Sequence, residues 1–371
     1  MSDYIHIVCL DAPSPPNYGG AIDMYYKLTS LAAVGKKIIL HYFDYRKNRN
    51  AGLLENCCTE IHSYSRKSFI RSFSFSSPYI ISSRINSSLI KRLNEDSHPI
   101  LLEGLHCSGI IPFLNDKNRV VLRMHNEEVN YYKSLVATEK KIFKKNYFNL
   151  ETALLKKYQK KLDKNLKTAC LSQKDISVLQ NEYGFTNLHF VPCFIPWQNI
   201  KSQVGKGHYC LYHGNMAVTE NEAAAVWLLK NVFSQINIPF VIAGSGISKK
   251  LFSLALKYTN SRLVYNPPVD ELNGLIKDAH INVLPSKNNT GVKLKLLHAL
   301  FEGRFCITNT NGIEGSNIQS GVHIANSPQE FIQLIQHLYS KEFTMDKIAE
   351  RKSVKDIYNN ETNTQKLSAL W

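Results

Sequence analysis

Residues 283–315 read VLPSKNNTGVKLKLLHALFEGRFCITNTNGIEG, and this stretch decides the fold of the second half of the chain. A short apolar run at residues 281–284 leads into a polar loop with Gly291, after which apolar residues recur at helical spacing up to Gly303. Residues 305–308 then form another apolar run. The order of strand, glycine-containing loop, helix and strand is that of a βαβ unit, whose two strands run parallel in one sheet.

The same order recurs at the start of the chain. Residues 4–10 (YIHIVCL) are a β-rich run, residues 11–20 are dense in Pro, Asn and Gly, and residues 21–34 have helical apolar spacing. Further apolar runs predict strands at residues 38–43, 100–103 and 120–124, and in the second half at residues 209–213, 240–243 and 262–265. The sequence therefore predicts an α/β protein with two parallel sheets of the Rossmann type.

The chain is long enough for two domains, since a domain usually holds about 100 to 200 residues. Residues 196–207 carry no sustained periodicity and predict a linker between a first domain at residues 1–195 and a second at residues 208–345. Residues 346–371 have a helical pattern, which we expect to form a helix that packs back across the cleft. Open α/β sheets bind ligands beyond the carboxyl ends of their strands, so we expect the ligand between the two domains.

Composition places the chain among ordinary folded proteins. It has 371 residues, of which 44% are hydrophobic, and eight scattered cysteines that indicate neither a disulfide framework nor a zinc site. The first residues lack the basic segment and long apolar run of a signal peptide, and no stretch approaches the roughly 20 apolar residues of a membrane span. We therefore expect a cytoplasmic protein, at most peripheral on the inner face of a membrane.

The net charge of +15 falls mostly in the first 200 residues. Residues 133–167 hold eleven lysines against Glu139, Glu151 and Asp163, and residues 140–166 have the spacing of a long amphipathic helix with one basic face. Such a face can be merely solvated, or it can attract an anionic lipid surface or a nucleic acid. The run lacks a recognised nucleic-acid motif, so no nucleic-acid partner is expected.

The loop that contains Gly291 predicts a phosphate site. A helix that starts beside such a loop offers unpaired backbone N–H groups and the positive end of its dipole. Lys293 and Lys295 add charge that suits a diphosphate. Because residues two apart on a helix face different ways, we expect only one of these lysines to contact a phosphate.

The quoted stretch resembles the retaining glycosyltransferases of family 4 (glycosyl transferases group 1). In that family a Pro-Ser or similar strand end, a glycine-containing loop, a helix with a Leu-Glu-Ala step and a Gly-Ile-Glu-Gly-like turn follow one another. The resemblance implies the GT-B fold, with two Rossmann-like domains that face each other across a cleft. Where the family has one acidic residue near the sugar and another at the ribose, this chain has Thr290 and His298.

The resemblance also implies roles for residues in both halves. The expected catalytic residues are His125, Lys293 and Lys295, although a histidine at a strand end can equally be structural. The expected donor-binding residues are Gly19, Gly20, Gly214, Asn215, Gly244, Asn266, Pro267, Thr290, Gly291, Val292 and His298. Glu103, His106, Asn126 and Glu127 lie near strand ends and are the expected acceptor-binding residues.

The predicted activity is transfer of a hexose-type sugar from a nucleotide diphosphate sugar to a hydroxyl group of a glycan or lipid-linked acceptor, in bacterial surface polysaccharide or glycoconjugate synthesis. Retention of anomeric configuration is implied by the resemblance alone. No metal or other cofactor is expected, because a helix start with a lysine can neutralise the diphosphate. Three alternatives remain, namely a sugar-nucleotide epimerase of the same fold, a basic nucleic-acid-binding protein, and a degenerate transferase that only binds partners.

Overall fold

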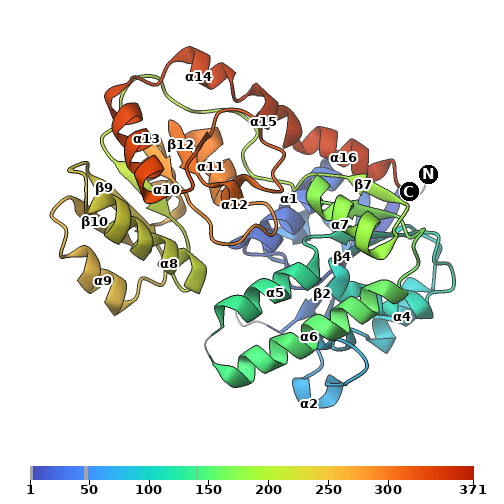
Figure 1. The fold of residues 1–371 in the computed structure, drawn as a ribbon. Helices are drawn as coiled ribbons and strands as arrows, with labels where there is room; N and C mark the ends of the chain where they lie inside the picture. Colours follow the sequence, from blue (N-terminus) through green and yellow to red (C-terminus); the bar gives the residue numbers. More distant parts are fainter. Residues whose placement is uncertain (1–2, 46–48, 140) are drawn as a thin grey trace. The chain divides into compact units, whose positions relative to one another are not determined.

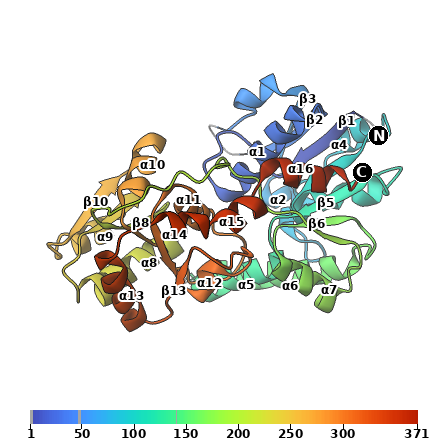
Figure 2. The same ribbon diagram turned by 90° about the horizontal axis from the view of Figure 1, so that it is seen from above.

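The computed structural model describes residues 3–45, 49–139 and 141–371. The chain divides into two compact units, an N-terminal unit of Met1–Pro196 with Tyr358–Trp371 and a C-terminal unit of Trp197–Ile357. Each unit is a parallel sheet covered by helices (Figure 1, Figure 2), which confirms the predicted α/β fold of two Rossmann-like domains. No helix within the described ranges is both long enough and apolar enough to cross a membrane.

The N-terminal unit is built on a seven-stranded sheet with the order β3-β2-β1-β4-β5-β6-β7. The strands are β1 (Tyr4–Cys9), β2 (Lys37–Asp44), β3 (Cys58–Ser65), β4 (Ile100–Glu103), β5 (Val120–Met124), β6 (Thr168–Cys170) and β7 (Leu188–Phe190). All neighbours pair in parallel. The strand order reverses between β1 and β4, and the carboxyl ends of two such strands are where open α/β sheets bind ligands.

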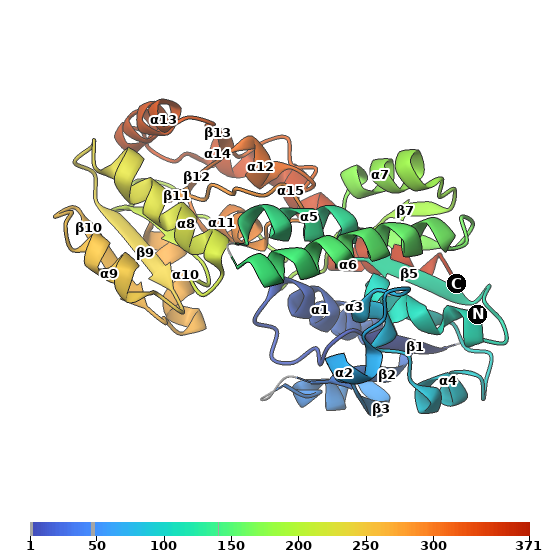
Figure 3. The ribbon, with the colours of Figure 1, turned by 60° about the horizontal axis from the view of Figure 1, so that its bottom comes forward.

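Helices cover both faces of this sheet. They are α1 (Gly19–Ala33), α2 (Phe69–Ser72), α3 (Tyr79–Ser82), α4 (Ser87–Leu93), α5 (Glu128–Thr138), α6 (Ile142–Lys161), α7 (Gln173–Tyr183) and α16 (Asn360–Ser368), with the short turns η1 (Gly52–Asn56) and η2 (Leu105–Phe113). On one face Met24 and Leu28 of α1 pack with Ile5 and Ile7 of β1. Val8 points to the other face, which lies under α4 to α7 (Figure 3), as the two-residue period of a strand requires.

The last segment of the chain returns to the N-terminal unit. α16 packs beside α1 (Figure 2), and Leu367 and Leu370 join the core on that face of the sheet. The side chain of Asn360 accepts a hydrogen bond from the Ile195 N–H (3.1 Å) and donates one to the Ile195 carbonyl (2.9 Å). These two bonds tie the start of α16 to the end of the first long segment of the unit.

The single helix predicted at residues 346–371 is wrong in its extent. The structure has α14 (Met345–Ala349), α15 (Lys352–Ile357) and α16 instead, and only α16 belongs to the N-terminal unit. A new helix starts at α16 because the Asn359 side chain accepts a hydrogen bond from the Thr362 N–H (2.8 Å), which is the role of an N-cap.

The amphipathic helix predicted at residues 140–166 is present as α6, which is shorter. Its first predicted residue, Lys140, lies outside the described residues. Leu154 and Leu155 are buried, whereas Lys156 and Lys157 on the opposite side are exposed. The basic face inferred from the sequence therefore faces solvent.

The C-terminal unit has a six-stranded sheet with the order β10-β9-β8-β11-β12-β13, and its pairs are all parallel. The strands are β8 (Cys210–His213), β9 (Phe240–Gly244), β10 (Ser261–Tyr265), β11 (Ile281–Val283), β12 (Phe305–Thr308) and β13 (His323–Ile324). The helices are α8 (Thr219–Leu228), which continues into the π-helical turn η3 (Leu229–Phe233), α9 (Lys249–Ala255), α10 (Val269–Asp278), α11 (Leu294–Glu302), α12 (Thr310–Ile313) and α13 (Pro328–Ser340), followed by α14 and α15.

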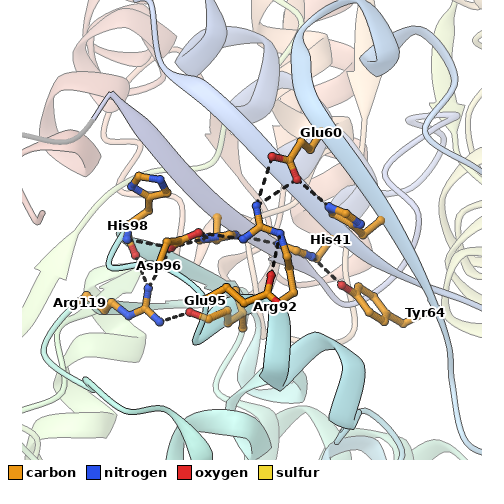
Figure 4. A network of polar contacts seen from close by, with 11 residues as sticks. His41, Glu60, Tyr64, Arg92, Glu95, Asp96, His98 and Arg119 are labelled. Carbon is orange, nitrogen blue, oxygen red and sulfur yellow. Dashed lines mark hydrogen bonds and ion pairs between the residues drawn. The ribbon is translucent and has the colours of Figure 1, made fainter.

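A chain of polar side chains crosses β1, β2 and β3 (Figure 4). The Nε2 of His6 lies 3.0 Å from Asp96 Oδ1, and its Nδ1 lies 2.9 Å from His41 Nε2. The Nδ1 of His41 lies 3.0 Å from the Tyr64 hydroxyl. Burial opposes ionisation of Asp96, but the Arg92 hydrogen bond helps to lower its pKa to about 2. The carboxylate can only accept, so His6 and His41 each carry a hydrogen on Nε2 and Tyr64 donates to His41.

This histidine chain predicts that folding is sensitive to acid. Burial lowers the pKa of His6 and holds the pKa of His41 well below 6.5, with His6, His62 and Arg92 adding to the effect on His41. The unfolded chain then binds more protons, so the free energy of unfolding is unaffected above about pH 6.5 and falls as pH decreases toward the lowered values. Replacing His41 by Gln keeps a donor and an acceptor without a titrating group. We expect His41→Gln to reduce the loss between about pH 7.5 and 5.5 by on the order of 1 kcal/mol.

Urea unfolding followed by circular dichroism at the two pH values measures this loss. His62→Gln is the matched control, because His62 stacks on His41 with ring centroids 5.1 Å apart but is 36% exposed. An identical pH dependence in the wild type and in His41→Gln would show that the buried ring does not set it.

Candidate active site

A buried network of charged side chains lies at the carboxyl ends of β4 and β5. Lys27 of α1 donates to both carboxylate oxygens of Glu103 (2.7 and 2.8 Å) and to Asp23 Oδ2 (2.8 Å). Arg123 of β5 donates to Asp23 Oδ1 (3.1 Å). His125, which follows β5, places its Nε2 2.7 Å from Glu103 Oε2. All five side chains are buried.

The charges in this network balance. Burial acts to raise the pKa of Asp23, but Arg123 and Lys27 outweigh it and hold that pKa well below its usual range. Burial likewise opposes ionisation of Glu103, whose pKa is nevertheless lowered by Lys27 and by the hydrogen bond from His125. Two carboxylates therefore face two cations, and no further ion is needed to neutralise the group.

The ionised Glu103 settles the tautomer of His125. A carboxylate accepts hydrogen bonds, so the Nε2 of His125 carries a hydrogen, and in the neutral imidazole Nδ1 is the acceptor. This Nδ1 faces Gly20, where an added Cβ would lie 3.6 Å from it and 3.1 Å from the Tyr18 ring. The absence of a side chain at Gly20 leaves room beside Nδ1. A hydroxyl group placed there could donate its proton to the ring, as general-base catalysis requires.

The same residues have the spacing of metal ligands. Asp23, Glu103 and His125 each offer one ligand atom, and these atoms lie within 4.8 Å of one another. The Lys27 ammonium already lies within 2.8 Å of both carboxylates, however, so a metal ion there would face a buried cation at close range. We assign no metal to this position.

Two of the predicted acceptor-binding residues have structural roles. Glu103 is fully buried in the network and is hydrogen-bonded to His125, and its contact with an acceptor stays a prediction. Glu127 caps α5, because its carboxylate accepts hydrogen bonds from the Val129 N–H (3.1 Å) and the Asn130 N–H (2.7 Å). These bonds give Glu127 a capping role, and its contact with an acceptor stays a prediction.

The other two predicted acceptor-binding residues are less buried. The Nδ1 of His106 lies 3.9 Å from Glu128 Oε1. Burial holds the pKa of His106 well below its usual value and raises that of Glu128 to about 8, so the neutral forms of both are favoured at neutral pH. Asn126 is half-buried beside His125 in the chain. Contact of His106 and Asn126 with an acceptor stays a prediction.

In the C-terminal unit, glycines let the loops after β8 and β9 touch. A Cβ on Gly244 would lie 1.8 Å from the carbonyl oxygen of Gly214, so a side chain there would displace the backbone. The loop after β10 joins them, because the Asn266 N–H donates to the Gly244 carbonyl (2.8 Å). Asn215 and Asn266 are exposed and Pro267 is half-buried. The glycines therefore have a packing role, and contact of these five residues with a donor stays a prediction.

Glu220 in the first turn of α8 holds the loop that follows β11. Its carboxylate accepts hydrogen bonds from the Ser286 hydroxyl (2.7 Å) and from the N–H groups of Lys287 and Asn288 (both 3.2 Å). The loop then passes through Gly291, whose φ of 65° is a left-handed value that favours glycine. The loop is therefore shaped by a carboxylate from another helix.

The helix after this loop begins later than the sequence suggested. α11 starts at Leu294, with Lys293 as an N-cap residue that makes no side-chain capping bond. Gly291 and Val292 thus lie in the loop. The Nζ of Lys293 donates to the Thr290 carbonyl (2.7 Å) and to the Asn288 side chain, so this lysine braces its own loop.

Lys295 has a different environment. Its Nζ donates to the Tyr212 hydroxyl and to Asn221 Oδ1 (both 3.2 Å) and lies 4.7 Å from the centre of the Tyr212 ring. Burial lowers the pKa of Lys295 to about 8, with Glu220 acting against the shift and Lys293 adding to it. Both hydrogen-bond acceptors are neutral, and no carboxylate of the described residues forms an ion pair with this ammonium.

His298 is packed as a neutral ring. It stacks on Trp197 with centroids 4.3 Å apart, and its Nε2 lies 2.9 Å from Asn273 Oδ1. Burial lowers its pKa to about 3. The predicted ribose contact stays a prediction, and the imidazole would make it without a charge.

Sequence reasoning missed Asp23, Lys27 and Glu220. The first two did carry a signal, because they are four residues apart on the face of α1 that also buries Met24 and Leu28. A charged pair on a buried helix face needs partners, which points to polar residues within the strands. The sequence around Glu220 gave no such signal, because an acidic residue in the first turn of a helix is common.

Comparison with known proteins decides the class of this one. Residues 207–341 match the family described as Glycosyl transferases group 1. The C-terminal unit therefore carries a glycosyl transferases group 1 domain. The resemblance based on residues 283–315 is thus confirmed at this level, whereas assignment to the retaining family 4 stays a prediction.

Similar proteins cover most or all of this chain. An uncharacterized 44.6 kDa protein in the cps region of Klebsiella pneumoniae is 28% identical over 360 residues, which are 91% of each chain. TarM has a TM-score of 0.67 at 12% identity and covers 100% of this chain and 99% of its own. WaaG, a glycosyltransferase involved in lipopolysaccharide biosynthesis, has a TM-score of 0.60 at 15% identity. The match covers 98% of this chain and 97% of WaaG. HepE of Anabaena with UDP-glucose has a TM-score of 0.67 at 8% identity (98% of each chain). These structures show the GT-B fold.

Removing the Lys27 ammonium should strongly destabilise the N-terminal unit. Lys27→Met leaves two buried carboxylates with one cation, and breaking a buried ion pair on one side costs about 3–5 kcal/mol. The exposed Lys157→Met is the control and should change stability by less than about 0.5 kcal/mol. Urea unfolding at neutral pH measures both. We expect Asp23→Asn to be less harmful in the Lys27→Met background than alone, and strict additivity would argue against the network.

Proposed function

We propose that this glycosyltransferase moves a hexose-type sugar from a nucleotide diphosphate sugar to a hydroxyl group of a glycan or lipid-linked acceptor. The observation that carries the donor half is the Lys295 ammonium, which is half-buried and hydrogen-bonded to neutral oxygens. A diphosphate would supply the missing negative charge. Stabilising that departing group is the main electrostatic task in such a transfer. HepE binds UDP-glucose, so uridine diphosphate sugars are the first donors to test.

The acceptor half of the proposal rests on His125. Its Nδ1 is an acceptor with room beside it, because position 20 is a glycine. We propose that this nitrogen receives a hydrogen bond from the acceptor hydroxyl or from the transferred sugar. Retention of configuration and a reaction without metal or other cofactor complete the proposed mechanism.

The biological setting is proposed from the relatives. The Klebsiella relative lies in a cps region, and WaaG is involved in lipopolysaccharide biosynthesis. Both support a role in bacterial surface polysaccharide or glycoconjugate synthesis. We propose that the protein works in the cytoplasm, at the inner face of the membrane, where a lipid-linked acceptor would be available.

Three other functions make different predictions. An epimerase of the same fold would change the donor sugar without an acceptor, whereas a transferase releases nucleotide diphosphate in proportion to acceptor. A degenerate transferase would be stabilised by a donor but would release nothing. A nucleic-acid-binding protein would bind DNA or RNA tightly, with a steep salt dependence. Nucleotide release with and without candidate acceptors, together with donor binding, separates these cases.

Replacing Lys295 should remove donor binding and yet stabilise the free protein. In the wild type, a donor at about a hundred times its dissociation constant should add about 2.7 kcal/mol to the free energy of unfolding. In Lys295→Met we expect most of this gain to vanish. The ligand-free variant should melt roughly 2–5 °C higher, because a desolvated charge gives way to an apolar side chain.

A thermal-shift panel of UDP-, GDP-, dTDP- and ADP-sugars measures both effects. Lys250→Met, at an exposed position of the same unit, is the control and should behave like the wild type. A Lys295→Met protein that melts lower and still responds to the donor would make this lysine structural.

Donor binding should also weaken in alkali. The pKa of Lys295 is about 8, so the ammonium is mostly present at pH 7 and mostly absent at pH 9. If the charged form binds the diphosphate, the dissociation constant should rise roughly tenfold between about pH 7 and 9. Isothermal titration of the wild type and Lys295→Met tests this. The variant should bind weakly at both pH values, and a constant wild-type affinity would contradict the role of the ammonium.

A further inference from the structure

Five large apolar side chains of the N-terminal unit stand exposed on two segments. Phe69 (45% exposed), Ile70 (92%) and Phe75 (78%) belong to α2 and the loop after it. Ile142 (62%) and Phe143 (87%) form the first turn of α6. Single exposed apolar residues are common, but a group of five at such exposure indicates a surface that binds something.

The two segments touch. The rings of Phe69 in α2 and Tyr147 in α6 lie 5.8 Å apart. Phe143 is four residues before Tyr147 and therefore lies on the same side of the helix. We call this surface the apolar tip, and it consists of Phe69, Ile70, Phe75, Ile142 and Phe143.

The apolar tip is firmly built. Glu151 of α6 is buried and accepts two hydrogen bonds from the Tyr79 N–H (3.0 and 3.1 Å), which holds the α2 to α3 segment against the helix. The Phe69 ring also packs against Phe73 (4.9 Å) and Tyr79 (5.2 Å). The exposed side chains are therefore presented by a packed aromatic layer beneath them.

The charges around the tip are mostly positive, although Glu139 lies three residues before Ile142. Residues 61–94 contain no Asp or Glu. Exposed cations flank the tip on both segments, namely Lys67, Arg71, Lys141, Lys144 and Lys145. More lysines, at positions 156, 157, 160 and 161, are exposed further along α6.

An anionic bilayer fits this combination better than other partners. Lipid headgroups attract the cations, while the interface below them accepts aromatic and aliphatic side chains. A nucleic acid would match the charges but would leave Ile70 and Ile142 in water. A second copy of this chain would bring another group of cations against the first, which is unfavourable.

We propose that the apolar tip inserts into the interface of an anionic membrane and that the flanking cations hold the protein there. This inference deepens the proposed function, because a lipid-linked acceptor would be met at that surface. Membrane binding itself requires neither donor nor acceptor, so it can be tested alone.

The test is co-sedimentation of the full chain with vesicles of phosphatidylcholine alone or with about 30% phosphatidylglycerol. We expect binding to the anionic vesicles to be at least tenfold stronger. The variant Ile70→Ser/Phe75→Ser/Phe143→Ser should lower the partition coefficient on anionic vesicles by about a hundredfold. Lys144→Glu/Lys145→Glu should lower it by at least about twentyfold, since each lysine near the surface contributes about fivefold.

Matched variants elsewhere control for charge and apolarity. Leu53→Ser and Leu256→Ser remove side chains that are each 72% exposed, and Lys250→Glu/Lys257→Glu makes the same change in net charge. These variants should bind like the wild type. Equal binding to neutral and anionic vesicles would overturn the proposal, and so would vesicle binding by the triple variant that equals that of the wild type. A nucleic acid that displaces the wild type and the triple variant from vesicles equally well would also overturn it. So would a dimer in analytical ultracentrifugation that only the triple variant abolishes.

Donor-induced thermal shifts measured on the same variants separate the two proposals. Loss of vesicle binding with an unchanged donor shift supports the role of the apolar tip. A wild type that binds vesicles but shows no donor shift would count against the proposed function and leave the membrane surface standing.

Discussion

The Lys27 ammonium is the group on which the N-terminal unit depends. It joins α1 to β4 through Glu103 and, through Asp23, to β5, where Arg123 completes the pairing. Asp23 also accepts a hydrogen bond from the Phe194 N–H (2.7 Å), so the end of the first segment is fastened to the same group. A buried polar network of this kind stabilises only when every member is satisfied. Because a single geometry satisfies all of them, the network also determines the orientation of the neighbouring His125.

The same sheet uses a carboxylate to orient histidines in a second place, and the comparison shows what is special about His125. In the chain from Asp96 through His6 and His41 to Tyr64, both nitrogens of each ring are hydrogen-bonded. That chain can contribute to stability and to its pH dependence, but it presents no free acceptor. At His125 the Glu103 carboxylate accepts a hydrogen bond from Nε2, and Gly20 leaves space beside Nδ1. Only the second arrangement can receive a proton from a substrate.

The sequence predicted most strongly what is local and apolar. β4 and β5 were placed to the residue, because strands buried on both faces are continuous apolar runs. β3 was not foreseen, since it is a half-buried edge strand whose side chains are largely polar (CTEIHSYS), and β6 and β7 have only three residues each. Loop positions in the C-terminal unit were found from spacing, and yet the start of α11 was misplaced. The reason is that Glu220, on another helix, shapes the loop before it.

The roles of the charged residues in the site depend on contacts between segments that are far apart in the sequence. Residue spacing along the chain does not reveal such contacts. Asp23 and Lys27 have meaning only once Glu103 and Arg123 are brought beside them, and Glu220 only once it meets the loop after β11. The sequence identified Lys295 as a candidate site residue, but it could not predict that Lys295 and Lys293 have different environments. Both are lysines at the start of one helix. Lys293 braces its own loop through a carbonyl, whereas Lys295 is half-buried and donates to a phenol and an amide.

The Lys27 network and Lys295 differ in how their charge is balanced. In the Lys27 network each carboxylate has a counter-charge, so the network is complete and serves to orient His125. In the C-terminal unit the Lys295 ammonium is desolvated without an anion, at a cost in stability that lowers its pKa to about 8. An apolar side chain of similar size would not carry this desolvation cost. The charge is explained if a ligand supplies the anion, and a diphosphate is the ligand that a group 1 glycosyltransferase would bring to it.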